Sequence, residues 1–469
     1  MPTIYGSPEE AVAEVPNGAS VAVSGFGLDH RFPSSLIRAL RDTDAKNLTL
    51  VCNSLGSDSS LRAVALIESR QVSKLIACFS ARPGSRSLAE DLIDAGEMTL
   101  ELVPQGTLVE RLRAGGSGIA GFFTRTGAGT LIADGKETRY FDGEPYIFER
   151  ALRVDYALIR AYQADTLGNL KFRGASANFN PAFAKAATFA IAEVDEIVEP
   201  GTFDPAEIGL PGIFVSGLVK TTVTPGMESV PPPRKPDVTR RRNYDRYGEG
   251  LSRLETAQLA TDLIPDGSYV NLGVGLPLLI ARCIEGRDLM LHAENGLLGH
   301  AGPVTGDARD PDYYNAGGQF VGLRHGASVF DSVTSFEMAR SARLVVVLGA
   351  YQVDADGHFA NWTNPSMTGG GIGGAMDLAS GAGRLVVVME HCDKNMRPKL
   401  IPRCTFPLTT SRPVDLVVTD LGAFRRVGER YLLERIARPF SVDDLRQLSG
   451  FDFDVSRELT AVGVDRVRS

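Results

Sequence analysis

Residues 17–28 (NGASVAVSGFGL) and 266–276 (DGSYVNLGVGL) carry one pattern twice: a short turn, an apolar run and a pair of glycines. A second pair follows later in each half, AYQADTLG at 161–168 and AYQVDADG at 350–357. Between the two motifs the first half carries about 59 more residues than the second. This repetition predicts two related domains, which we expect to pack around a pseudo-twofold axis with a ligand cleft between them.

Short apolar runs of four to six residues recur along the chain without alternation, as in strands buried on both faces of a parallel sheet. Stretches with helical periodicity lie between many of them, at 33–41, 56–69, 105–114 and 331–339. Alternating strands and helices indicate right-handed βαβ units. The predicted fold is therefore α/β, two related, open, mostly parallel sheets in one chain. The apolar runs are at 21–24, 48–52, 156–159, 269–272, 289–291, 344–348, 385–389 and 416–419.

One segment breaks this pattern. Residues 222–250 are rich in proline and charge and poor in apolar side chains, which is typical of a linker or surface crossing. We therefore expect a first domain at 1–221, a linker at 222–250 and a second domain at 251–469.

The composition narrows the functional class. Of 469 residues 43% are apolar and 23% charged, and the formal net charge of −8 gives no general attraction to nucleic acid or anionic membrane. Residues 1–14 do not resemble a signal peptide, and no run approaches the roughly 20 apolar residues of a membrane span. Five scattered cysteines without a C-x-x-C pair favour a reducing, cytoplasmic location.

The two glycine pairs, Gly25 with Gly27 and Gly273 with Gly275, each follow a predicted strand. Glycine there permits positive φ and a close approach of backbone N–H groups to an anionic ligand. Neither pair completes a G-x-G-x-x-G motif, which argues against a dinucleotide site. A plain tight turn is the alternative.

Glu294 stands directly after the apolar run that ends near Ala293, in the sequence Glu294-Asn295-Gly296. An Asn-Gly turn with a solvated carboxylate beside it is one interpretation. The other is a functional carboxylate at the carboxyl end of a central strand, where open α/β sheets place ligands. The related stretch of the first half, Val51-Cys52-Asn53-Ser54, has no acid, which favours specialisation of Glu294.

Two further motifs bear on function. Five glycines at 369–374 indicate either a flexible linker or a loop that cradles a ligand. His391 and Cys392 are neighbours in the chain, so they do not form a nucleophile–base pair, and the six histidines lack zinc-binding spacing. We expect no metal site.

Taken together these motifs resemble the family I CoA-transferases, above all the 3-oxoacid (succinyl-CoA:3-ketoacid) type with its two subunits fused. The resemblance covers nearly the whole chain. It rests on GFGL at 25–28, PQGTLVER at 104–111, NFN at 178–180, NLGVGLP at 271–277, ENGLLG at 294–299, ANW at 360–362 and GGAMDL at 373–378.

The resemblance implies that Glu294 is the catalytic nucleophile and passes through a glutamyl-CoA thioester in a ping-pong exchange. It implies CoA as co-substrate with no permanently bound cofactor or metal, an acyl-CoA and a carboxylic acid as partners, and a homodimer or higher homo-oligomer. The implied site consists of an oxyanion and CoA loop with Gly371, Gly273 and Gly275, and of substrate-binding residues Asn53, Gln105, Gly25, Gly27 and Asn295.

The chain departs from the family pattern near the active loops. The family usually has two asparagines where this chain has Asn53 and Ser54, and a lysine where it has Gly370. Fewer cations weaken binding of a second carboxylate or a CoA phosphate, so the acceptor acid stays open. Two other functions stay open as well: an acyl-CoA hydrolase that uses the same Glu294, and a catalytically silent ligand-binding protein on this fold.

Overall fold

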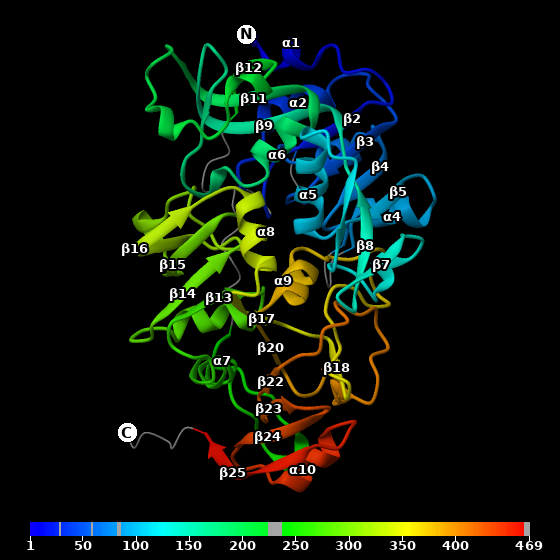
Figure 1. Cartoon of the computed structure of the whole chain (residues 1–469), viewed down its shortest axis with the longest axis vertical. Coiled ribbons are helices and arrows are strands. Elements are labelled where there is room, and N and C mark those ends of the chain that lie inside the picture. Colours follow the sequence, from blue (N-terminus) through cyan, green and yellow to red (C-terminus); the bar gives the residue numbers. More distant parts are fainter. Residues whose placement is uncertain (28–29, 58–59, 82–85, 224–236, 464–469) are drawn as a thin grey trace.

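The computed structural model describes residues 1–27, 30–57, 60–81, 86–223 and 237–463. These residues form two stacked α/β halves with one large sheet in each, and the described chain runs from the far end of the first half to the far end of the second (Figure 1). The predicted fold class is confirmed.

The sheet of the first half is almost entirely parallel. Only the short β10 (Leu170–Lys171) runs antiparallel, against β9. The order is β1 (Thr3–Ile4), β12 (Gly217–Lys220), β11 (Ala187–Val198), β9 (Val154–Asp165), β2 (Ser20–Val23), β3 (Leu48–Cys52), β4 (Val72–Ala77), β5 (Thr99–Leu102).

The sheet of the second half has a parallel centre, β14-β13-β17-β20-β22, and antiparallel neighbours on both flanks. Its order is β16 (Val321–Val329), β15 (Leu297–Pro303), β14 (Leu289–Ala293), β13 (Ser268–Leu272), β17 (Leu344–Leu348), β20 (Arg384–Met389), β22 (Leu416–Thr419), β23 (Gly422–Val427), β24 (Arg430–Ala437), β25 (Asp454–Val462).

Both centres have the same topology, which confirms the internal repeat. The parallel series β3-β2-β9-β11-β12 of the first half corresponds strand by strand to β14-β13-β17-β20-β22 of the second. Asn53 follows β3, and Glu294 follows β14, so the two positions compared from sequence are equivalent in the fold. The halves differ outside the repeat, because parallel β4 and β5 continue the first sheet where antiparallel β15 and β16 continue the second.

Each predicted strand lies within or beside an observed one, and three predicted helices agree with α2, α5 and α8 to within two residues. The predicted helix at 56–69 is correct only at its end, where α3 forms, and residues 58–59 lie outside the described part. The helices are α1 (Pro8–Val12), α2 (Ser34–Arg41), α3 (Val64–Glu68), α4 (Leu88–Asp94), α5 (Gln105–Gly116), α6 (Asn180–Ala186), α7 (Arg253–Asp262), α8 (Ser332–Arg340), α9 (Ala375–Gly381) and α10 (Val442–Leu448).

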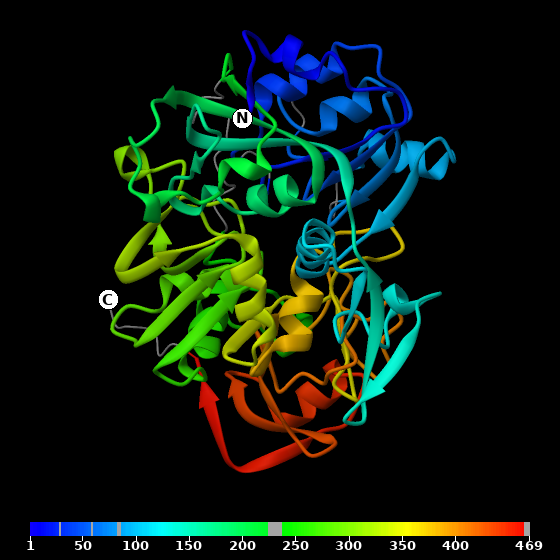
Figure 2. The ribbon, with the colours of Figure 1, turned by 45° about the horizontal axis from the view of Figure 1, so that its top comes forward.

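Three helices meet where the halves join. Helix α5 of the first half packs against α8 and α9 of the second, at the centre of the molecule (Figure 2). One connected cluster of buried apolar side chains crosses this junction and includes Leu108 of α5, Phe336 of α8 and Leu378 of α9. The hydrophobic effect therefore stabilises the two halves as one body.

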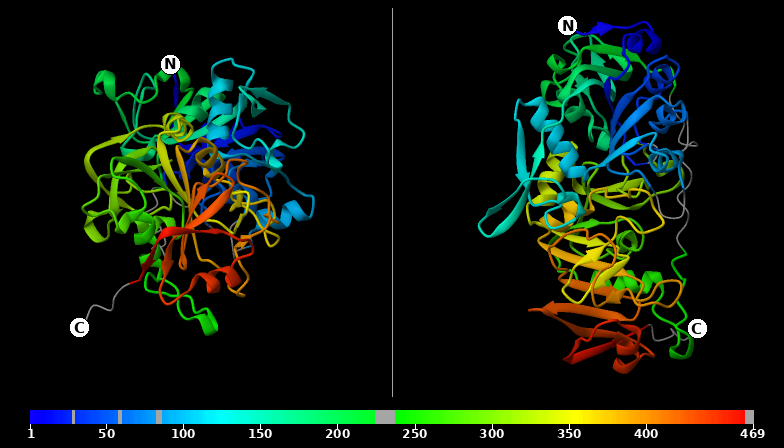
Figure 3. Two further views of the ribbon diagram at one scale, coloured as in Figure 1. Left: turned by 60° about the horizontal axis from the view of Figure 1, so that its bottom comes forward. Right: turned by 90° about the vertical axis from the view of Figure 1, so that its right-hand side faces the viewer.

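Two small sheets accompany the two large ones. The extra residues of the first half form an antiparallel sheet that projects from the side of the molecule (Figure 3, right). Its strands are β6 (Gly121–Thr124), β8 (Glu144–Arg150) and β7 (Thr138–Phe141). In the second half β19 (Phe359–Ala360), β18 (Gln352–Asp354) and β21 (Leu400–Ile401) form the other.

The segment at 222–250 is more than a surface spacer. Residues 224–236 lie outside the described part, but the residues after them pack onto the second half. Tyr244 is fully buried, and its hydroxyl lies 2.9 Å from both carboxylate oxygens of Asp420. Arg242 of the same segment also binds the second half, through the Glu390 carboxylate and the carbonyl of Asp393. The polar composition of the segment concealed these anchors. Among the described residues, no helix has the length and apolar character that crossing a membrane requires.

Candidate active site

Glu294 is held at the carboxyl end of a buried strand. It follows β14, which pairs with β13 in parallel register, so that Asn271 of β13 lies opposite His292. The Asn271 amide donates a hydrogen bond of 3.1 Å to Oε2 of Glu294. Glu294 taken as a whole residue is partly buried. Removal of water by the surrounding protein raises the pKa of the Glu294 carboxyl, and the hydrogen bond from Asn271 opposes that shift.

The turn after Glu294 is fixed by its surroundings. Gly296 has φ 110°, and a Cβ there would lie 2.0 Å from the carbonyl oxygen of Phe330, so only glycine fits. Asn295 is buried, and its Nδ2 donates to the carbonyl of Tyr314 at 2.9 Å. The carboxylate therefore lies beside a rigid, packed turn, and the interpretation as a freely solvated Asn-Gly turn is wrong.

A buried histidine orients Asn271. The Asn271 amide nitrogen lies 3.0 Å from Nδ1 of His292, and Nε2 of His292 lies 3.0 Å from the Ser335 hydroxyl. Burial lowers the pKa of His292 to about 3, so the ring is neutral. Since the amide nitrogen is a donor, Nδ1 accepts and Nε2–H donates to Ser335. This arrangement leaves the second amide hydrogen of Asn271 for Glu294.

The first half contributes two buried amides, both predicted from sequence. Asn53 follows β3 and Gln105 begins α5, and Nε2 of Gln105 donates to Oδ1 of Asn53 at 2.6 Å. Asn53 Nδ2 and Gln105 Oε1 have no hydrogen-bond partner among the described residues. Unpartnered buried polar atoms cost free energy unless a ligand or water engages them. The pair can therefore offer one donor and one acceptor to a bound molecule.

The glycine turn of the first half lies against the Glu294 turn. Gly25 has φ 129°, and a Cβ there would lie 2.5 Å from Phe32. The ring of Phe26 lies 6.2 Å from that of Tyr314, whose carbonyl accepts the Asn295 hydrogen bond. The hydroxyl of Ser54 donates to the carbonyl of Gly27, which joins this turn to the end of β3. Leu28, which completes the motif, lies outside the described part.

The predicted oxyanion donors need correction. The N–H of Gly371 donates to the carbonyl of Trp362 at 2.9 Å, and that of Gly273 donates to Val347 at 2.8 Å. Neither is free to stabilise a reacting oxygen in this structure. Gly275 has φ 97°, and the space where a Cβ would stand is open. The glycine-rich loop is a docking element rather than a flexible linker, because Gly371 forms a β-bridge with Phe79 of the first half.

Two residues of this site were missed from sequence, Asn271 and His292. Each interrupts a buried apolar strand with a polar side chain. Polar residues are rare in strands buried on both faces, so this interruption was the signal that could have identified them.

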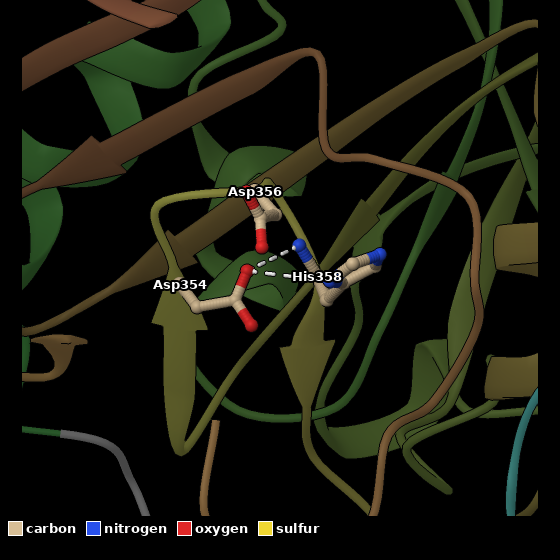
Figure 4. A group of neighbouring side chains, drawn as sticks. All are labelled: Asp354, Asp356 and His358. Atoms are coloured by element: carbon tan, nitrogen blue, oxygen red, sulfur yellow. Dashed lines mark hydrogen bonds and ion pairs between the residues drawn. The ribbon is translucent and has the colours of Figure 1, made fainter. Parts of the chain in front are cut away.

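Among the described residues one group has the composition of a metal site, Asp354, Asp356 and His358 (Figure 4). Its contacts are those of a turn. Asp354 accepts the backbone N–H of His358 at 2.9 Å and that of Cys404 at 3.1 Å. Asp165, its counterpart in the first half, accepts the N–H of Asn169 at 2.9 Å in the same way. The repeat thus accounts for Asp354 as a turn-stabilising residue.

Comparison with known proteins agrees with this geometry. The coenzyme A transferase family matches residues 5–221 and 254–447. The chain is 37% identical over 477 residues to the human protein named succinyl-CoA:3-ketoacid coenzyme A transferase 2, mitochondrial. The aligned region covers 97% of this chain and 90% of the human protein. The first half is 50% identical over 216 residues to one subunit of the Xanthomonas campestris enzyme named succinyl-CoA:3-ketoacid coenzyme A transferase, covering 46% of this chain and 87% of that protein.

A solved structure shares the fold over nearly the whole length. An Escherichia coli O157:H7 acyl-CoA transferase, solved as a thioester complex with CoA, superimposes with a TM-score of 0.79 at 21% identity and covers 99% of this chain and 96% of its own. Sequence motifs, repeated topology, family match and full-length relatives agree on one conclusion. The chain belongs to the coenzyme A transferase family and is a CoA-transferase.

Proposed function

We propose that this enzyme moves CoA between an acyl-CoA and a carboxylic acid by a ping-pong mechanism with Glu294 as the nucleophile. The observation that carries the proposal is a carboxylate held at a strand end by the hydrogen bond from Asn271. The first half adds two buried polar atoms without a partner among the described residues, Asn53 Nδ2 and Gln105 Oε1. The names of the full-length relatives support succinyl-CoA and a 3-ketoacid as the first substrate pair to test.

In the first half-reaction a carboxylate oxygen of Glu294 attacks the thioester carbonyl carbon. The C–S bond breaks, CoA leaves as a thiolate, and a mixed anhydride remains. The thiolate then attacks the glutamyl carbonyl carbon of that anhydride. The C–O bond breaks, the donor acid leaves as a carboxylate, and Glu294 carries CoA as a thioester. An acceptor carboxylate repeats both steps in reverse, so the thioester bond energy is kept.

The surroundings of Glu294 support this chemistry. Its raised pKa makes the ionised carboxylate a better nucleophile than an exposed one, and the hydrogen bond from Asn271 favours the ionised form. When the glutamyl carbon becomes tetrahedral, the Asn271 amide, which already donates to Oε2, can donate to the developing oxyanion. We therefore assign that role to Asn271 in place of Gly371.

The amides of the first half are proposed to bind the acyl part of the substrate. Asn53 Nδ2 donates and Gln105 Oε1 accepts, a combination that suits a neutral polar group on the acyl chain. Gly25, Gly27 and Asn295 are proposed to border the same substrate. Gly275 is proposed to face CoA, because the space where its Cβ would stand is open. CoA enters as co-substrate, and the proposed chemistry uses no metal.

The decisive experiment traps the covalent intermediate. The full chain is incubated with succinyl-CoA alone and treated with borohydride, which reduces a glutamyl thioester but leaves a carboxylate intact. The peptide that contains Glu294 should change in mass, and Glu294→Ala should show neither the change nor CoA exchange. Exchange retained in Glu294→Ala would overturn the proposal, and CoA release independent of acetoacetate would identify a hydrolase.

Two coarser proposals accompany the mechanism. All five cysteines are free thiols, which supports a reducing compartment such as the cytoplasm, although the human relative is named as mitochondrial. Fractionation of cells that express the chain distinguishes the two.

We also propose a homodimer or larger homo-oligomer, supported by the exposed aromatic side chains Tyr140 and Phe141 on the projecting sheet. Light scattering of the purified protein measures its mass.

A further inference from the structure

The first N–H groups of α5 are capped by the other half of the molecule. Its N-cap residue is Pro104, whose side chain accepts no hydrogen bond. The N–H of Gln105 donates to the carbonyl of Gly373 at 2.9 Å, and that of Gly106 donates to Oδ2 of Asp377 at 2.8 Å. A helix begins with N–H groups that lack partners within the helix, so these contacts replace a local cap.

Asp377 is built into this position. It is fully buried at the start of α9, and its other oxygen, Oδ1, accepts from the Thr126 hydroxyl at 3.2 Å. Arg340 of α8 lies 3.7 Å from that oxygen. A Cβ at position 106 would lie 2.4 Å from Oδ1, so a glycine is required for the carboxylate to reach the helix. A buried carboxylate needs such partners, and here they come from three separate elements.

The residue beside this cap is Gln105. Its amide nitrogen donates to Asn53, and its Oε1 is buried without a partner among the described residues. The direction of that side chain depends on where the first turn of α5 begins. That first turn is itself fixed by the hydrogen bonds to Gly373 and Asp377. A carboxylate at a helix N-terminus also interacts favourably with the helix dipole, which strengthens the restraint.

We propose that Asp377 is a positioning residue: from the second half it sets the orientation of Gln105, and through it the binding of the acyl part of the substrate. The proposal rests on the proposed function of Glu294 and adds a residue to it. Asp377 itself touches neither the reacting atoms nor, in the described structure, the amide pair. Its effect on the reaction passes through the start of α5.

The test is a double-mutant cycle on the full chain, with succinyl-CoA and acetoacetate as the substrate pair. Asp377→Ala and Gln105→Ala should each raise the KM for acetoacetate by about tenfold, equal to about 1.4 kcal/mol, with a smaller change in kcat. The double variant should have nearly the KM of Gln105→Ala alone, because both changes remove one interaction. Asp377→Asn, which keeps the shape and one acceptor oxygen, should fall between wild type and Asp377→Ala.

Glu110→Gln is the matched control. Glu110 is on the same helix and forms an ion pair of 3.3 Å with Arg340 across the same junction. Because Arg340 also lies 3.7 Å from Asp377, the variant reports loosening of the junction around Asp377 while the hydrogen bonds of Asp377 and Gly373 to the start of α5 are left unchanged. Its KM should stay close to that of wild type. Asp377→Asn replaces Asp377→Ala if the latter does not fold.

Effects of Asp377 and Gln105 that multiply, or a loss of thermal stability with unchanged KM, would overturn the positioning role. These results are distinct from a failure of the proposed function. If the wild-type chain forms no borohydride-reducible thioester, the proposed role of Glu294 is refuted. If the thioester forms but the mutant cycle is additive, only the role of Asp377 is refuted.

Discussion

Arg31 of the first half holds Asp312 of the second in a two-pronged contact, with Nε 2.6 Å from one carboxylate oxygen and Nη2 2.7 Å from the other. The Asp312 side chain is completely shielded from solvent. Next to this pair in the sequence, the ring of His30 stacks on Tyr314 at 3.5 Å. Because the Tyr314 carbonyl accepts the Asn295 hydrogen bond, this contact connects the halves beside the Glu294 turn.

Replacing Arg31 by Ala should therefore destabilise the whole chain. The change leaves Asp312 as a buried carboxylate with only the longer contact to Arg173, and breaking a buried pair in this way costs about 3–5 kcal/mol. Urea denaturation measures the loss. Arg41→Ala is the control, because the partner of Arg41 is the exposed neighbour Asp42, and such pairs contribute about 0–1 kcal/mol. Equal losses for the two variants would contradict the expectation.

Asn271→Ala should lower kcat by about 100-fold or more, as the loss of a single oxyanion donor does in other enzymes. The same change removes the hydrogen bond that favours ionised Glu294, so the pKa of Glu294 should rise further. Steady-state rates across pH measure both effects. Asn395→Ala, an exposed asparagine in a turn, serves as the control. A normal kcat in Asn271→Ala would remove Asn271 from the mechanism.

The transfer rate should fall in acid with a midpoint above the usual pKa of glutamate. Burial raises the pKa of Glu294, and only the ionised carboxylate is a nucleophile, so activity is full above that pKa and is lost as the pH drops through it. The pH profile of kcat/KM, recorded with an acyl-CoA that does not itself titrate in this range, measures the midpoint. Borohydride trapping at Glu294 should follow the same curve. A midpoint at or below the usual value would show that the carboxylate is effectively solvated.

Gly106→Ala should destabilise the junction, because its Cβ would lie 2.4 Å from Asp377 and 2.7 Å from Phe336. Overpacking of this kind costs about 1–3 kcal/mol. Thermal unfolding measures the effect. Gly322→Ala is the control, since its nearest neighbours would stand at 3.5 Å, an ordinary contact distance. A stable Gly106→Ala variant would mean that α5 moves away from Asp377 without cost.

Treatment with a chelator should change neither the activity nor the stability of the protein. The carboxylate oxygens of Asp354 already accept the N–H groups of His358 and Cys404, so we expect no metal there for the chelator to remove. Asp354→Ala should instead cost about 1–3 kcal/mol by leaving buried N–H groups without partners. Asp165→Ala should do the same in the first half. Denaturation of the two variants tests this equivalence, and a chelator-dependent fall in stability that Asp354→Ala abolishes would show that the group binds metal.

The sequence was most informative where the burial of a residue depends only on the strand or helix that contains it. Near-continuous apolar runs located β3, β17 and β22 residue for residue, since burial on both faces of a parallel sheet requires such runs. It was least informative just before α3, where the described residues 60–63 of a helical period do not form a helix, and at Tyr244, a buried side chain within a polar segment.

By itself the sequence determined the α/β class, the internal repeat, the relation of Glu294 to the stretch 51–54, and the CoA-transferase family. Local periodicity and repeated motifs carry the fold class and the repeat, because they report burial and turns within each element. The family followed from the resemblance of several motifs, in order along the chain, to the CoA-transferases. Only the tertiary structure decided that Asn271 contacts Glu294, that the Gly371 N–H is already engaged, and that Asp377 caps α5 from the other half. Asp377 and Gly106 are 271 positions apart in the chain, and contacts at such separation depend on how the two sheets and their helices pack, which no local pattern records.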